Sequence, residues 1–244
     1  MTPINTLFDR MDAWRHLPNY QLERRADIFF SLYLPEVLEA KLGFPIRSDL
    51  IPEFPVRIGT IYKNIPIDKS YKIDYVALSA AGDKVVFVEL KTDGQSCRPK
   101  QDRYLLAAQD AGLAALLSGV LDIFRATDSK PKYFCLLKQL ESIGLLRIPE
   151  SLTAIMAGPT LQGANEASGD VEVTAKAEKP LIVYILPNAP KVAAGQTDAV
   201  TPVIISFSEF ADVVRRHDDP VSHRFAASLR EWADVPAGGR KPLS

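Results

Sequence analysis

The sequence predicts an α/β protein in which helices flank a central mixed β-sheet. Residues 73–79 and 84–91 are rich in β-branched, aromatic and aliphatic side chains, and Ala-Ala-Gly-Asp joins them in the pattern of a β-hairpin. Apolar residues occupy both faces of these two strands, as in a sheet that is covered by helices on each side. Segments 21–42 and 100–124, before and after the hairpin, have the apolar spacing of amphipathic helices.

The elements before the hairpin follow from helix and strand punctuation. We expect a short helix and a loop within residues 1–20, and then a helix over 21–42 that Pro35 should kink or divide and Gly43 should end. Prolines surround one strand-like run, 56–62, and therefore place it near an edge of the sheet.

The elements after the hairpin alternate between apolar and polar segments. Residues 92–99 predict a polar loop, 100–124 and 132–146 predict helices, and 158–180 predicts a long surface loop. The remaining expectations are strands at 181–186 and 202–207, a loop at 187–201, a helix capped by Ser208, and a last helix at 221–233.

Composition sets limits on the class of protein. The chain has 244 residues, is 47% hydrophobic and carries a net charge of −1, so any contact with nucleic acid must come from local basic clusters. Its two cysteines are far apart, the start lacks a signal-peptide pattern, and the longest uncharged apolar run, 111–121, is shorter than the ~20 residues that span a bilayer. We expect a cytoplasmic protein with no membrane partner, with one domain over 1–234 and a disordered tail at 235–244.

Three polar side chains gather at one end of the predicted hairpin. With the turn centred on Ala81 and Gly82, Asp74 opposes Glu89 on one face, and Lys91 lies one step beyond. A turn shifted by one residue on each strand would set Asp74 against Lys91 instead. Opposed carboxylates repel each other, and a divalent cation would relieve that repulsion. On residue types alone, a solvated salt-bridge cluster explains the same three side chains equally well.

The order of these residues resembles a known nuclease superfamily. Asp74 at the start of one strand, Glu89-Leu90-Lys91 at the end of the next, and Gln101 at the start of the following helix are similar to the PD-(D/E)xK, or restriction-endonuclease-like, nucleases. Locally the pattern is similar to VRR-type nuclease domains, in which a glutamine follows the lysine. The resemblance covers residues 73–112, with isoleucine in place of the proline of the family name and a helix continuing after Gly112 where the VRR-type pattern enters a strand.

The resemblance implies a fold and a chemistry. It implies a restriction-endonuclease-like core (αβββαβ) with helical and loop insertions, and a hydrolase that cleaves phosphodiester bonds, in DNA, with Mg²⁺ or with Mn²⁺ as a substitute. Asp74, Glu89 and the carbonyl of Leu90 would hold the metal, Lys91 would orient water or stabilise the transition state, and Gln101 would position water or phosphate. Because many such nucleases cut as dimers, a homodimer is also expected. We expect alanine at Asp74 or Lys91 to abolish cleavage without unfolding the chain.

Two further sets of residues complete the expected site. In the superfamily a helix before the hairpin often adds an acid, for which Glu23 and Asp27, four residues apart on one helical face, are the candidates. Glu36 and Glu39 compete with them, and ordinary solvated helix carboxylates are the alternative. Basic residues at the start of helix 100–124 predict contacts with backbone phosphates, with an exposed basic turn as the alternative: Arg98, Lys100 and Arg103.

Other classes of function remain open or find no support. The alternative to a nuclease is a catalytically inactive nuclease-like domain that binds nucleic acid or a protein partner. An unrelated enzyme with the loops 158–180 and 187–201 as a lid has no residue set to support it. Phosphate-binding glycine loops, a nucleophile elbow and zinc-ligand spacings are all missing from the sequence.

Overall fold

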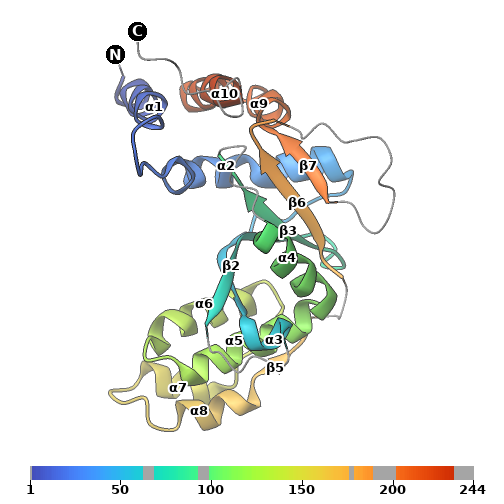
Figure 1. The fold of residues 1–244 in the computed structure, drawn as a ribbon. Helices are drawn as coiled ribbons and strands as arrows, with labels where there is room; N and C mark the ends of the chain where they lie inside the picture. Colours follow the sequence, from blue (N-terminus) through green and yellow to red (C-terminus); the bar gives the residue numbers. More distant parts are fainter. Residues whose placement is uncertain (1, 63–68, 93–98, 176–178, 189–201, 234–244) are drawn as a thin grey trace. The chain divides into compact units, whose positions relative to one another are not determined.

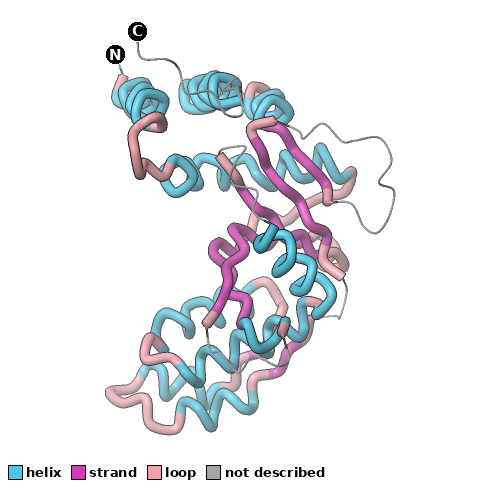
Figure 2. The backbone as a smooth tube through the Cα atoms, in the orientation of Figure 1, coloured by secondary structure: helices cyan, strands magenta, loops and turns pink. Residues whose placement is uncertain are grey.

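The computed structural model describes residues 2–62, 69–92, 99–175, 179–188 and 202–233 (Figures 1 and 2). The chain divides into two compact units, each assembled from separate stretches of sequence. Unit 1 comprises Met1–Ser48, Val88–Pro99 and Ile182–Ser244, and unit 2 comprises Asp49–Phe87 and Lys100–Leu181. The expected tail at 235–244, most of loop 92–99 and most of loop 187–201 lie outside the described residues.

Five strands form a mixed sheet, which confirms the predicted α/β class. The strands are β1 (Ile51–Arg57), β2 (Ser70–Leu78), β3 (Val85–Leu90), β6 (Leu181–Leu186) and β7 (Val203–Ser206), in the order β1-β2-β3-β6-β7. The β1–β2 pair is antiparallel and the β6–β7 pair is parallel. The predicted strands at 84–91 and 181–186 are present as β3 and β6, and nearly all of their residues are buried.

The first strand lies at an edge, as its prolines predict, but not at the expected residues. Strand β1 carries Pro52 and Pro55, which lack the N–H that an inner strand must donate. The prediction of a strand over 56–62 was wrong, because β1 ends at Arg57 and the short helix α3 (Ile58–Ile61) follows.

Unit 1 packs four helices around an aromatic core. These are α1 (Pro3–Trp14), α2 (Leu22–Leu42), α9 (Phe207–Val214) and α10 (Pro220–Ala233). Phe30 of α2 meets Phe210 and Phe225 with ring centroids 5.0 and 5.2 Å apart, and all three rings are buried. Of the two expectations for Pro35, a kink or a division, the division is wrong, because α2 continues through this proline. Gly43 ends the helix in a left-handed conformation, as predicted.

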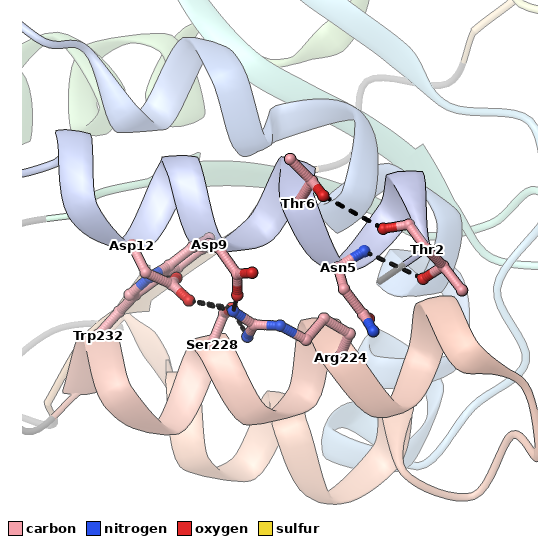
Figure 3. A network of polar contacts seen from close by, with 8 residues as sticks. All are labelled: Thr2, Asn5, Thr6, Asp9, Asp12, Arg224, Ser228 and Trp232. Carbon is pink, nitrogen blue, oxygen red and sulfur yellow. Dashed lines mark hydrogen bonds and ion pairs between the residues drawn. The ribbon is translucent and has the colours of Figure 1, made fainter.

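A buried polar network joins α1 to α10 (Figure 3). Asp12, which is 9% exposed, accepts hydrogen bonds from Trp232 Nε1 at 2.8 Å, Arg224 Nη2 at 2.5 Å and Ser228 Oγ at 3.2 Å. Asp9 adds a second carboxylate to Arg224 at 2.8 Å. Burial lowers the pKa of Arg224, but the hydrogen bonds to Asp9 and Asp12 outweigh that effect and raise the pKa above its ordinary value.

Helix α9 begins two residues earlier than expected. Ser206, not Ser208, is the N-cap: its hydroxyl accepts from Glu209 N at 3.2 Å, and the Glu209 carboxylate accepts from Ser206 N at 2.7 Å. This reciprocal capping box satisfies two donors that the helix start leaves without intrahelical partners. Lys41 of α2 binds the same carboxylate group at 2.6 Å.

Unit 2 places two helices where one was predicted. Residues 100–124 form α4 (Pro99–Ala111) and α5 (Leu113–Ala126), which meet at an angle of 103°. Gly112 lies between them with φ +77°, a conformation that side-chain-bearing residues rarely adopt. Further along α5, Gly119 approaches α3 so closely that a Cβ atom would lie 2.4 Å from Thr60 Oγ1.

The remainder of unit 2 is a small layer of short elements. The predicted helix at 132–146 is present as α6 (Lys130–Ser142). The prediction of a long loop at 158–180 was wrong, because this segment contains α8 (Ala164–Ala167), the 3-10 helix η1 (Ser168–Asp170) and the strand β5 (Glu172–Val173). Strand β5 pairs with β4 (Leu146–Arg147), and α7 (Glu150–Ala157) lies between β4 and α8 in the sequence. Arg125 of α5 fixes this layer by donating to Ser168 Oγ at 2.9 Å and Ser168 O at 3.0 Å.

Over the described residues, no single helix combines the length and apolar composition that crossing a membrane requires. The segments Arg103–Ala111 and Leu113–Ala126 meet that test only as a pair, across the bend at Gly112.

Candidate functional site

The predicted hairpin turn has the expected register. Ser79 N donates to Lys84 O at 3.0 Å, and Gly82, with φ +73°, donates to Ser79 O at 2.9 Å. The Ser79 hydroxyl accepts from Asp83 N at 3.1 Å and Lys84 N at 3.0 Å. Pairing of residues 79 and 84 is the centred turn of the two that the sequence allowed, so the shifted alternative is excluded at the turn.

Glu89 and Lys91 form a buried ion pair at the end of β3, within unit 1. Because side chains alternate along a strand, residues two apart share a face, and Lys91 Nζ lies 2.6 Å from Glu89 Oε1. Glu89 is 2% exposed and Lys91 is 3% exposed. Lys91 Nζ also donates to Leu90 O at 2.9 Å, and Lys91 N donates to Ile185 O at 2.9 Å, which anchors this residue to β6.

Burial makes this pair unusual in physical terms. Lysine and glutamate are almost never fully buried unless they are paired. Removing two charges from water costs several kcal/mol per ion, and only close pairing with further hydrogen bonds offsets that cost. The Glu89 carboxylate and the Leu90 carbonyl both accept from the Lys91 ammonium group and so offset part of the cost of burying it.

Asp74 lies on β2, in unit 2. It is half-buried between the buried residues Ile73 and Tyr75, and its side chain points to the opposite face of the strand from both. Strand β2 is next to β3 in the strand order of the sheet.

Helix α4 is anchored on β2 by a pair of tyrosines that the sequence analysis did not single out. The rings of Tyr71 and Tyr104 stack with centroids 4.7 Å apart and planes 9° from parallel, and Tyr104 OH donates to Lys72 O at 3.0 Å. Arg103, one of the expected phosphate contacts, is exposed beside this anchor. Lys100 and Gln101 belong to the first turn of α4, but their side chains, like all of Arg98, lie outside the described residues.

The candidate acids on the preceding helix are both on α2 of unit 1. Glu23 is half-buried and Asp27 is exposed, and Asp27 Oδ1 accepts a hydrogen bond from Ile28 N at 2.7 Å. Of the competing pair, Glu36 binds His217 Nε2 at 2.6 Å and Glu39 is exposed.

The chemistry of the donors determines which metal they would suit. Among the described residues, no group of three or more His, Cys, Asp or Glu side chains could hold a metal ion. The candidate ligands, which are the Asp74 and Glu89 carboxylates and the Leu90 carbonyl, therefore do not form an all-protein cage of the kind that binds structural zinc. Two carboxylates and a carbonyl suit Mg²⁺, which keeps several waters and takes further oxygens from substrate phosphates. Two of the candidate oxygens, Glu89 Oε1 and Leu90 O, already accept hydrogen bonds from Lys91.

Unit 1 also contains a basic cavity that the sequence did not predict. Its volume is about 350 Å³, and it is lined by Arg215 at the end of α9 and by three residues of α10: His223, Ala227 and Arg230. The spacing of those three residues, i, i+4 and i+7, places them on one face of a helix, and this pattern could have predicted one wall of the cavity from the sequence. The approach of Arg215 depends on how α9 packs against α10.

Compared with protein-family models, with curated proteins and with solved structures, the chain shows no significant match.

Proposed function

We propose that the chain is a metal-dependent nuclease that hydrolyses phosphodiester bonds, with DNA as its substrate. The observation that supports this most is the buried Glu89–Lys91 pair, because an acid and an amine held 2.6 Å apart at the end of an apolar strand are costly to bury and are the pair that such chemistry uses. The neighbouring places of β2 and β3 in the strand order also fit the motif. We also propose that the sheet and its helices form the restriction-endonuclease-like core (αβββαβ) that the resemblance implies.

The proposed roles follow from the donors. The register predicted from the sequence sets Asp74 opposite Glu89, and in this proposal these two carboxylates would hold Mg²⁺. The metal would supply an activated water and neutralise charge on the phosphoryl oxygens. Lys91 would hold the Glu89 carboxylate in place and stabilise negative charge on the scissile phosphate.

The test is cleavage by the purified full chain. We expect Mg²⁺ or Mn²⁺ to be required for degradation of at least one of four substrates: linear duplex, single-stranded or branched DNA, and RNA. Asp74→Asn should reduce the rate at least ~100-fold, because it replaces the charged carboxylate of a proposed metal ligand by a neutral amide. Asp110→Asn is the matched control, since Asp110 is 70% exposed and its ion pair within the described residues is with the exposed Lys179. Absence of cleavage on all four substrates with either metal would refute the proposal.

One observation favours a second candidate, a nuclease-like domain that binds nucleic acid without cutting it. The Lys91 ammonium already contacts Glu89 Oε1 and Leu90 O, so a cation is present at these oxygens without a metal. Calorimetric titration of the chain with Mn²⁺ separates the two candidates. A nuclease binds the ion and loses this binding in Glu89→Gln, whereas a binding-only domain retains nucleic-acid affinity in EDTA and shows no Mn²⁺ binding that depends on Glu89.

A further inference from the structure

The basic cavity between α9 and α10 of unit 1 has the form of a ligand site. Its volume of about 350 Å³ lies within the range of small-molecule sites, roughly 300–1,000 Å³. Ala227 lies between His223 and Arg230 on one face of α10, and its small side chain leaves the hollow that longer residues would fill. Three of the four lining residues carry nitrogen donors and none is acidic.

The charges around the cavity leave one guanidinium without a counterion. Arg215 is exposed and forms no ion pair within the described parts of the chain. Arg230 is held by Asp212 at 2.6 Å, which fixes its guanidinium, and Asp218 lies 3.5 Å from His223 with its side chain fully exposed. The remaining nearby acid, Asp219, accepts hydrogen bonds from Val221 N at 2.9 Å and Ser222 N at 3.0 Å and so caps the start of α10.

We propose that this cavity binds a small phosphomonoester, with Arg215, Arg230 and His223 as donors to its phosphate group. Guanidinium groups suit a phosphate because their parallel N–H groups match its oxygens in pairs. The ring N–H of His223 supplies a further donor. The cavity has room for an organic group beside the phosphate, whereas a groove for a polynucleotide would have to continue beyond these four residues. This proposal does not depend on nuclease activity.

The experiment is calorimetric titration of the full chain in EDTA, which removes divalent metals from any metal centre. The probes are inorganic phosphate, adenosine 5′-monophosphate, glucose 6-phosphate and, without a phosphate, adenosine. We expect all three phosphate-bearing probes to bind and adenosine not to bind. Tighter binding of either organic phosphate than of inorganic phosphate identifies a phosphomonoester site, and equal or tighter binding of inorganic phosphate overturns that assignment.

Three variants locate the site. Arg215→Gln should weaken binding about tenfold or more, because it removes a charged donor pair. Ala227→Leu should have a similar effect by filling the hollow, and it suits an exposed helical position. Arg216→Gln is the control: Arg216 is the next residue, is also exposed and changes the net charge equally, but it does not line the cavity.

The outcomes are separable from misfolding. Thermal melting should show all three variants folded, since each replaces an exposed residue. The proposal is overturned if no phosphate-bearing probe binds the wild-type chain at millimolar concentration, or if adenosine binds as well as its monophosphate. It is also overturned if Arg216→Gln weakens binding as much as Arg215→Gln, because the effect would then come from overall charge.

Discussion

Replacing Lys91 by methionine tests whether the Glu89–Lys91 pair is as buried as the structure has it. Methionine retains most of the length and apolar packing of the lysine stem, so the main loss is the ammonium group. That group makes hydrogen bonds of 2.6 Å to Glu89 Oε1 and 2.9 Å to Leu90 O. Breaking a buried pair by removing one partner costs about 3–5 kcal/mol, because the other charge stays behind in a dry site.

The double variant carries the sharper prediction. Glu89→Gln together with Lys91→Met removes both charges, and the replacement of a whole buried pair by uncharged residues is often close to neutral. We therefore expect the double variant to be more stable than Lys91→Met alone, with a coupling free energy of about 2 kcal/mol or more.

The assay is urea unfolding followed by circular dichroism, from which each free energy of unfolding is extrapolated to water. The exposed pair Lys179–Asp110 is the matched control, since its two residues are 67% and 70% exposed and its coupling should stay below about 1 kcal/mol. If Lys91→Met costs less than 1 kcal/mol and shows no coupling to Glu89→Gln, the pair is solvated and our reasoning about the site is wrong. The same burial means that alanine at Lys91 should destabilise the chain, contrary to the expectation from sequence.

Three further predictions concern the two units. In unit 1, Asp12→Ala should lower the free energy of unfolding by about 3–5 kcal/mol, and Asp9→Ala by under about 1, as measured by urea unfolding, because only Asp12 is buried. Burial raises the pKa of Glu209, but hydrogen bonds from Lys41 and Ser206 outweigh that effect and hold the pKa below its ordinary value. The resulting stability is present above the ordinary pKa of a glutamate and is lost as pH falls through the lower pKa of Glu209 in the folded chain, so Glu209→Gln should flatten the acid side of a stability profile. In unit 2, Gly119→Ala should lower the free energy of unfolding by about 1–3 kcal/mol, because the added Cβ atom would collide with Thr60, and the melting temperature should fall accordingly. Adding Thr60→Ala to this variant should restore part of the lost stability.

The sequence predicted correctly those elements whose structure is determined by residues close together in the sequence. The hairpin was predictable because two runs rich in β-branched, aromatic and aliphatic residues flank a turn containing Gly82, and Gly43 marks the end of a helix because it too adopts a positive φ. The errors arise where two local patterns compete. Ser206 and Ser208 are both acceptable caps, and the reciprocal bonds with Glu209 decide between them. Within 100–124, helical spacing continues across Gly112, whose positive φ breaks the helix.

The candidate site was predictable only as far as residues share a strand. Glu89 and Lys91 are two apart, so their common face follows from the pleat alone. Their depth of burial does not follow, because it depends on packing by residues distant in sequence. The basic cavity shows the same limit: α10 presents His223, Ala227 and Arg230 on one face, but the position of Arg215 is set by the packing of α9.

The packing of α1 against α10 has a consequence for folding during synthesis on the ribosome. Phe8 is fully buried, and its ring packs against Phe225, which is synthesised more than two hundred residues later. At translation rates of about 5–20 residues per second, the nascent amino-terminal helices wait roughly 10–40 s for that partner. During this interval their aromatic faces are without their native cover, which makes them natural substrates for a holding chaperone. A chain that stops prematurely, before residue 207, leaves those faces uncovered permanently.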